Sequence, residues 1–221
     1  MKDDAAQRVA SRFRSRFLRN YVASKLATDP LYRAVADRLI DHTLPLTDIG
    51  CGVGLMAFYL RERGVRMPIT GIDHDRKKID EAKQIALQYD GISFAASDAR
   101  DPIPAGTSVL LLDVLHYFSD AARDRMLETI AAGVADGGVV IIREGIRDGT
   151  LRYRITLAAE VFARVVRWLK AERLNFPTRE AIVRPFRERG FTEEVVPLWG
   201  RTPFNNYLFV FRREASGSTK R

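Results

Sequence analysis

Three glycines are spaced so that their segment can hold a nucleotide-type ligand. Gly50, Gly52 and Gly54 separate an apolar run from a helical pattern, where missing side chains let a ligand approach backbone amides at a helix N-terminus. A simple tight turn would need only one glycine. The dinucleotide pattern G-x-G-x-x-G requires a further glycine where this chain has Leu55, so the spacing disfavours a NAD-dependent dehydrogenase.

Polar side chains follow the next two apolar runs of the chain. Asp73 ends the run at residues 69–73, and its carboxylate can accept hydrogen bonds from both hydroxyls of a ribose. Asp98 follows the run at residues 92–96 and can accept from an adenine amino group, although an ordinary loop-capping role is an equally open alternative. Cys51 is the single cysteine, and because no basic partner accompanies it we interpret it as a packing residue and not a nucleophile.

Four short motifs occur in the order and spacing of the class I S-adenosylmethionine-dependent methyltransferases, which the chain resembles over residues 45–145. They are DIGCGVG at 48–54, GID at 71–73, SDA at 97–99 and DVLH at 113–116. The resemblance implies S-adenosylmethionine as cofactor. It also implies a Rossmann-like α/β fold, with a seven-stranded sheet that is mostly parallel, an antiparallel last strand and helices on both faces. The cofactor-binding residues that it implies are Asp48, Gly50, Cys51, Gly52, Gly54, Asp73, His74, Asp98, Ala99 and Asp113. Asp48 and the glycines would face the methionine portion, Asp73 the ribose, and Asp98 with Ala99 the adenine.

A histidine and a glutamate are candidates for acid–base chemistry. VLHYFSD at 114–120, followed by VVIIRE at 139–144, resembles small-molecule O-methyltransferases, whose motif carries a general-base histidine and a nearby glutamate; His116 and Glu144 fall on these positions. An imidazole with a pKa of about 6.5 can take the proton of a phenol with a pKa of about 10 while the methyl group is transferred. Glu144 would orient the imidazole and stabilise its charged form. The alternatives are a histidine that packs beside the cofactor and a plain strand-end charge.

The chain alternates apolar runs and helical patterns in a way that can bring these residues together. Five runs, at 46–50, 69–73, 92–96, 108–115 and 139–144, are separated by helical segments, which predicts parallel strands with crossover helices. Two further runs, at 191–199 and 205–213, have no helix between them and are therefore expected to be antiparallel. We expect an N-terminal helical cap at 1–44, a methyltransferase domain at 45–213 with a lid insertion at 150–189, and a disordered tail at 214–221.

Helical patterns outside the sheet predict the surface that selects the acceptor. Residues 5–27 predict one basic amphipathic helix, with apolar side chains on the face that packs in the core and arginines at the other positions. That face consists of Val9, Phe13, Phe17, Tyr21 and Leu26. A second helix is expected at 29–41 and an inserted lid helix at 150–172. Tyr21, Phe162 and Trp168 are the predicted acceptor or lid residues.

Composition limits the class of protein. A chain of 221 residues with 46% hydrophobic content can bury one sizeable core, and no apolar run approaches the ~20 residues of a membrane span. We expect a cytoplasmic protein, with association at a membrane surface as an open alternative. One cysteine excludes an internal disulfide and a multi-cysteine metal site, and no metal is expected. The net charge of +8 predicts an affinity for anions.

The acceptor is the open question. A small, aromatic or lipid-like hydroxyl compound is the main prediction, and the basic charge is compatible with an acidic carrier protein or an anionic membrane that presents it. The segment at 20–32, NYVASKLATDPLY, resembles methyltransferases of bacterial aryl-polyene pigment pathways. An RNA methyltransferase is a second possibility, although the Asn/Asp-Pro-Pro-aromatic and Pro-Cys motifs of base-methylating enzymes are missing. A non-catalytic cofactor-binding module is a third.

Overall fold

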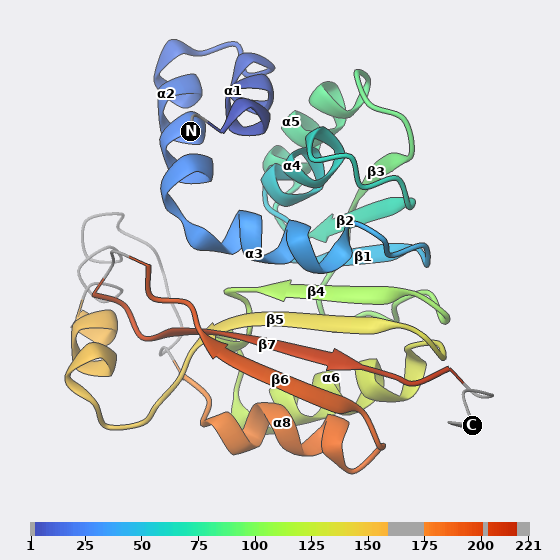
Figure 1. Cartoon of the computed structure of the whole chain (residues 1–221), viewed down its shortest axis with the longest axis vertical. Helices are drawn as coiled ribbons and strands as arrows, with labels where there is room; N and C mark the ends of the chain where they lie inside the picture. Colours follow the sequence, from blue (N-terminus) through green and yellow to red (C-terminus); the bar gives the residue numbers. More distant parts are fainter. Residues whose placement is uncertain (1–2, 159–174, 201–202, 216–221) are drawn as a thin grey trace. The chain divides into compact units, whose positions relative to one another are not determined.

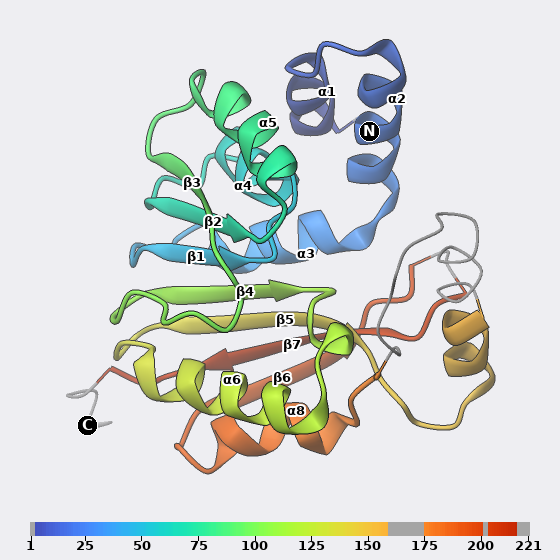
Figure 2. The ribbon, with the colours of Figure 1, turned by 180° about the vertical axis from the view of Figure 1, so that it is seen from behind.

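The chain consists of two compact units, residues 1–101 and 102–221. The computed structural model describes residues 3–158, 175–200 and 203–215 (Figures 1 and 2). Among these residues, no helix combines the length and the apolar character that a membrane span requires.

The first unit is built on three parallel strands in the order β3-β2-β1. Their bounds are Leu46–Ile49 for β1, Ile69–Asp73 for β2 and Ile92–Ala96 for β3. Two crossover helices connect them, α4 (Leu55–Glu62) and α5 (Arg76–Ala86). All four residues of β1 are buried. Because parallel strands end at the same edge of a sheet, the loops after β1, β2 and β3 meet there, and these loops carry the predicted cofactor residues.

Three helices precede the first strand: α1 (Asp4–Ser11), α2 (Arg16–Thr28) and α3 (Pro30–Leu39). The second predicted helix is confirmed, since the Asp29 side chain accepts from the Leu31 amide and caps α3. The single helix predicted over residues 5–27 is wrong. It ends at Ser11, and a new helix begins after Ser15, whose hydroxyl accepts from the Leu18 amide.

The break also changes which side chains of this segment reach the core. Val9, Phe13 and Leu26 are buried, as predicted from the amphipathic pattern. Phe17 and Tyr21 are 78% and 51% exposed, so the prediction that they pack in the core is wrong. The physical reason is that the non-helical residues between α1 and α2 shift the rotational phase of the second helix relative to the first.

The second unit has four strands in the order β4-β5-β7-β6. Their bounds are Ser108–Leu112 for β4, Val139–Gly145 for β5, Thr192–Pro197 for β6 and Asn206–Arg212 for β7. β4 and β5 are parallel, whereas β7 runs antiparallel to both of its neighbours. Together with the three strands of the first unit, these four strands give the predicted seven, and the last strand is antiparallel as predicted. The predicted fold class is confirmed.

Helices of the second unit are the 3-10 helix η1 (Leu115–Tyr117), α6 (Asp120–Gly133) and α8 (Arg179–Arg187). Residues 151–158 are helical and form the described beginning of the predicted lid. All seven residues of β5 are buried. Phe186 of α8 stacks on Phe211 of β7, with ring centroids 4.1 Å apart, and burial of such a side chain stabilises the fold by about 1.5–3 kcal/mol. This packing holds β7, which pairs with β5, the strand that carries Glu144.

Candidate functional site

The loop between β1 and α4 requires its glycines for conformation and for space. Gly50, Gly52 and Gly54 all have positive φ values, of 76°, 59° and 78°. A Cβ atom at Gly54 would lie 2.4 Å from Phe94 Cζ, whereas one at Gly52 would meet no atom within 4 Å. The loop therefore packs against β3 on one side and is open at Gly52, where a ligand can approach the backbone.

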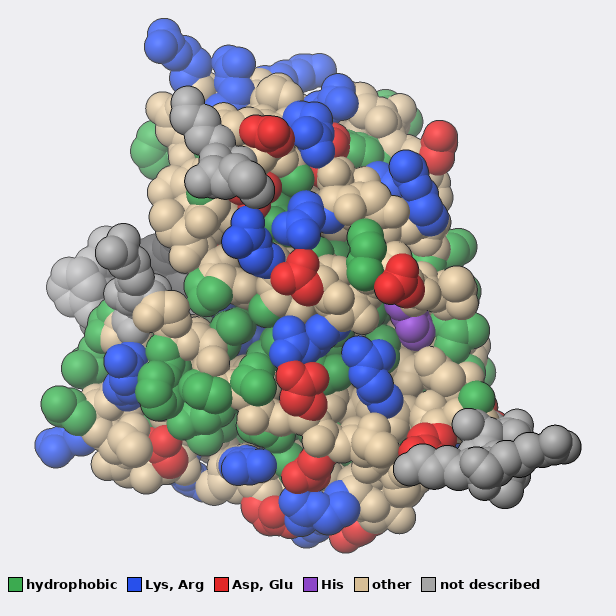
Figure 3. All heavy atoms as spheres, viewed as in Figure 1, with side chains coloured by type: hydrophobic (Ala, Val, Ile, Leu, Met, Phe, Trp, Pro, Cys, Tyr) green, Lys and Arg blue, Asp and Glu red, His purple; other side chains and the backbone are tan. Residues whose placement is uncertain are grey.

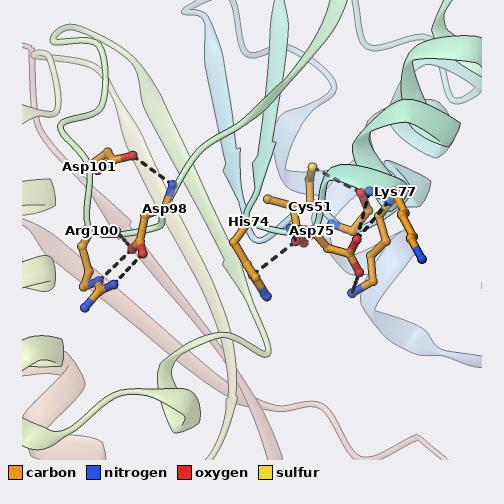
Figure 4. Close-up of polar contacts among 10 residues, drawn as sticks. Cys51, His74, Asp75, Lys77, Asp98, Arg100 and Asp101 are labelled. Atoms are coloured by element: carbon orange, nitrogen blue, oxygen red, sulfur yellow. Dashed lines mark hydrogen bonds and ion pairs between the residues drawn. The ribbon is translucent and has the colours of Figure 1, made fainter. Parts of the chain in front are cut away.

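Asp73, at the end of β2, holds this loop in place. Its two carboxylate oxygens accept hydrogen bonds from the backbone amides of Gly52 and Asp75, each at 2.9 Å. His74 contributes its Nδ1 atom 3.4 Å from the same carboxylate, and Figure 4 shows His74 beside Cys51 and Asp75. A carboxylate has about four lone-pair sites, so these bonds leave acceptor capacity for ligand hydroxyls. The bond to Gly52 is a role that sequence reasoning missed.

Two acidic side chains, Asp48 and Asp73, lie close to the Cys51 thiol at this edge of the first unit. Asp48 is 2% exposed, and burial, followed by repulsion from Asp73, raises its pKa to about 7. Burial and the same two carboxylates raise the pKa of the Cys51 thiol. A neutral thiol is a poor nucleophile, which supports the interpretation of Cys51 as a packing residue. A ligand that brings a positive charge to Asp48 would favour its ionised form.

Asp98 is engaged by a neighbouring arginine. Arg100 donates from Nε and Nη2 to its two carboxylate oxygens, at 2.8 and 2.6 Å, and this pairing lowers the pKa of Asp98 to about 2 (Figure 4). Asp101 accepts from the Asp98 amide at 2.9 Å and from the Ser97 hydroxyl at 2.7 Å. Sequence reasoning missed both Arg100 and Asp101. An adenine amino group would have to share the Asp98 carboxylate with Arg100.

His116 and Glu144 are brought together in the second unit, in the loop after β4 and near the end of β5. His116 Nδ1 lies 2.7 Å from Glu144 Oε1, and the His116 backbone amide donates to Oε2 at 3.2 Å. The Gly145 amide donates to Oε1 at 3.0 Å. His116 and Glu144 are only 4% and 1% exposed. Because an ionised carboxylate can only accept, it holds the proton on Nδ1 and leaves Nε2 as the basic nitrogen of the neutral ring.

Aromatic rings surround the imidazole of His116. Phe176 stacks on it, with centroids 5.2 Å apart and planes at 28°, and Tyr117 lies 4.2 Å away. Tyr153 meets Phe176 edge to face at 6.0 Å. Gly145 permits this arrangement, since a Cβ there would come 3.0 Å from Phe176 Cε1. Nothing in the local sequence pattern identified Phe176, because it is separated from His116 by 60 positions along the chain.

Asp113, the remaining acidic residue predicted at the cofactor, is held in a bidentate pair. Arg143 donates from Nε to Oδ1 at 2.8 Å and from Nη2 to Oδ2. Asp113 has a left-handed backbone with φ of 60°, which costs about 1–3 kcal/mol in a residue other than glycine. Its amide donates to the Arg143 carbonyl at 2.9 Å, so strand pairing and the ion pair together hold the strained residue.

The predicted acceptor residues have separate outcomes. Tyr21 lies on α2, half exposed, with Lys25 Nζ 5.9 Å from the centre of its ring. Phe162 and Trp168 lie outside the described residues. Ala99 is half-buried in the loop after β3. Contact with an acceptor or a cofactor stays a prediction for all of these residues.

Comparison with known proteins identifies the class of the domain. Residues 46–138 match the family model of a methyltransferase domain. A carboxy-S-adenosyl-L-methionine synthase of Trichodesmium erythraeum is 26% identical over 143 residues, 58% of this chain and 55% of that protein. The strychnine O-methyltransferase of Strychnos nux-vomica is 26% identical over 160 residues, 64% of this chain and 43% of that protein. The chain spans about half the length of the curated relatives it matches.

A solved structure shows the same fold. Magnesium protoporphyrin IX methyltransferase from Synechocystis, with bound S-adenosylhomocysteine, has a TM-score of 0.67 and 19% identity, and covers 96% of this chain and 93% of its own. Residues 46–138 therefore resemble a methyltransferase domain, and the chain shares the fold of that solved methyltransferase. These similarities agree with the predicted family, class of enzyme and cofactor, and they confirm the predicted fold class.

Proposed function

We propose that the protein transfers a methyl group from S-adenosylmethionine to the hydroxyl oxygen of a small acceptor. The observation that carries this proposal is the buried His116–Glu144 pair, in which a carboxylate is fixed 2.7 Å from one imidazole nitrogen. Glu144 accepts three hydrogen bonds, two from His116 and one from the Gly145 amide. An incidental charge at the end of a strand would not need to be held so firmly. Such a pair supplies a general base, which hydroxyl methylation needs and which methylation of a stronger nucleophile does not.

The residues of the first unit fit S-adenosylmethionine. Its sulfonium and ammonium groups carry positive charge, and Asp48 and Asp73 provide negative charge close to the glycine loop. The ribose hydroxyls can donate to the lone pairs of Asp73 that its two backbone bonds leave over. When bound, the cofactor supplies an electrophilic methyl group on a positively charged sulfur.

The chemistry proposed for the second unit is proton removal from the acceptor. Nε2 of His116 would accept the hydroxyl proton as the oxygen takes the methyl group, and breaking of the carbon–sulfur bond would leave the sulfur as a neutral thioether. Glu144 stabilises the imidazolium that results, because its carboxylate lies 2.7 Å from Nδ1. Solvent then takes the proton from the imidazole. The base contributes about 10²–10⁴-fold, and positioning of the acceptor supplies much of the remaining acceleration.

The acceptor class that we favour is apolar or aromatic. Tyr117, Tyr153 and Phe176 place three aromatic rings at or next to His116. Ligand sites of this kind bind mainly through apolar surface, with a few polar groups that set orientation. The similarity to an enzyme named as an O-methyltransferase supports the same choice. A carrier-tethered acceptor remains a variant of this proposal, since a flexible tether could deliver the same chemical group.

Partition of label among acceptor pools tests the proposal. The full chain would be incubated with methyl-labelled S-adenosylmethionine and, separately, with phenolic acids, carrier-tethered aryl acids and bulk RNA. We expect label in one of the aryl pools, released by conditions that cleave methyl ethers or esters and not by conditions specific for N-methyl groups. Label only in RNA would contradict the proposal, and binding of the cofactor without turnover in any pool would indicate a non-catalytic module.

A further inference from the structure

Helix α2 presents two aromatic side chains to solvent. Phe17 is 78% exposed and Tyr21 51% exposed, and at a spacing of four residues they lie on the same side of the helix, one turn apart. Single exposed apolar residues are ordinary on protein surfaces. Two adjacent exposed aromatic rings on one helix face form a patch that requires an explanation of its own.

Folding of the first unit does not use this face. Val22 and Leu26 are the buried residues of α2, which packs against α1. Leu26 is nine residues from Phe17, and nine steps of 100° place the two on opposite sides of the helix. The exposed rings therefore point away from the contact that attaches α2 to the unit.

The surroundings of the two rings are basic. Residues 5–28 contain six Arg and Lys residues and no Asp or Glu. Arg8 and Arg12 make contacts with Glu62, but within the described part of the chain Arg14, Arg16 and Lys25 form no ion pair with a carboxylate. Figure 3 shows Lys and Arg side chains gathered over the part of this face formed by α1, α2 and α5. We refer to Phe17, Tyr21 and Lys25 of α2, together with Arg14 just before the helix, as the basic-aromatic face of α2.

We propose that the basic-aromatic face of α2 binds the surface of a membrane that contains anionic lipids. A phenyl ring has no hydrogen-bonding group, so polar contacts with a charged partner do not involve Phe17. The boundary between lipid headgroups and acyl chains, by contrast, accommodates apolar rings. Flanking arginine and lysine side chains can reach lipid phosphates at the same time. The lipid surface satisfies both features of the face, whereas an acidic protein satisfies mainly the charge. RNA bases can stack on aromatic rings, so RNA is one arm of the test.

Vesicle flotation of the full chain tests this proposal. We expect binding to vesicles of phosphatidylcholine mixed with phosphatidylglycerol and little binding to phosphatidylcholine alone. Lys25→Gln should lower the partition coefficient about five-fold, the usual effect of one basic residue at an anionic surface. Phe17→Ser should lower it about tenfold or more, because the ring no longer leaves water.

A matched control separates apolar insertion from a general loss of surface hydrophobicity. Leu87 lies just after α5, in the same unit, and is 82% exposed, so Leu87→Ser removes a similar side chain outside the face. We expect this variant to bind vesicles like the wild type. All variants alter exposed side chains, and an unchanged thermal unfolding midpoint would verify that they fold.

Three results would overturn the proposal. The first is equal binding to neutral and anionic vesicles, and the second is unchanged binding by Phe17→Ser. The third is displacement of the chain from vesicles by bulk RNA, with RNA affinity that Phe17→Ser also lowers, which would identify the surface as a nucleic-acid site. None of these outcomes depends on methyl transfer.

Discussion

Replacing Asp48 with asparagine should stabilise the protein above neutral pH while weakening its cofactor site. The buried Asp48 has its pKa raised to about 7, mainly by loss of water and further by Asp73. In the unfolded chain the same carboxyl group has a pKa of about 3.9. Between these two values the folded protein binds the proton more tightly than the unfolded chain does, so the free energy of unfolding falls as pH rises from about 4 to about 7.

The size of this effect follows from the difference between the two pKa values. A difference of about three pH units, at about 1.36 kcal/mol for each, gives as much as about 4 kcal/mol of lost stability above pH 7. The asparagine side chain would have nearly the same shape and no charge to desolvate. The Asp48→Asn variant should therefore match the wild type at about pH 4 and exceed it by up to about 4 kcal/mol at about pH 8.

Urea unfolding at several pH values measures this difference directly. Asp41→Asn is a suitable control, because Asp41 is exposed and its substitution should leave the pH dependence unchanged. Calorimetry adds the functional arm: wild-type affinity for S-adenosylmethionine should rise with pH through about 7, as Asp48 becomes ionised, and the Asp48→Asn variant should bind weakly at every pH. A variant that is no more stable than the wild type at alkaline pH, or that retains the same pH dependence of binding, would refute this reasoning.

Three further substitutions probe the remaining parts of the site. Asp73→Ala should weaken binding of S-adenosylmethionine by about 1–3 kcal/mol in calorimetry, because it removes the carboxylate that holds the Gly52 amide and is assigned to the ribose. Unchanged affinity would disprove this assignment. The wild-type protein should not bind NAD. Gly54→Ala should lower the free energy of unfolding by about 2–5 kcal/mol, because alanine is strained in a left-handed backbone and its Cβ would overpack against Phe94. A smaller loss in thermal unfolding would mean that the Phe94 ring can move. Asp113→Asn should destabilise the second unit by about 1–3 kcal/mol, because Arg143 would lose its ion-pair partner; a neutral effect in urea unfolding would show that Asp113 serves the ligand and not the fold.

Much of the fold could be predicted because strands and caps leave local signals. The strands around the glycine loop are bounded by turn residues, and Asp29, Asp75 and Thr178 each cap the helix that follows them. The break between α1 and α2 escaped prediction because arginine, serine and phenylalanine alternate through it, and the apolar period alone continues across Ser15. A capping serine inside a periodic pattern is a weak signal until tertiary packing selects one phase of the helix.

In the site, too, contacts set by neighbouring strands could be predicted, whereas contacts set by distant parts of the chain could not. Contact between His116 and Glu144 could be predicted because His116 follows β4 and Glu144 lies at the end of β5, and these strands are adjacent and parallel. The partners of the predicted carboxylates, Arg100 for Asp98 and Arg143 for Asp113, could not, because arginine side chains are long and their pairing depends on loop geometry. Phe176 is another example, since its position over the imidazole is set by chain far from β4 and β5.

The most direct test of the central claim is the pH dependence of methyl transfer in single-turnover reactions with the preferred acceptor. In the wild type the rate should rise with pH as an imidazole loses its proton, and then level off. His116→Ala should be slower by about 10²–10⁴-fold, lack this rise, and bind S-adenosylmethionine with nearly unchanged affinity, while His42→Ala should behave like the wild type. Full activity of His116→Ala toward that acceptor, or loss of cofactor binding together with activity, would contradict the assignment of His116 as the general base.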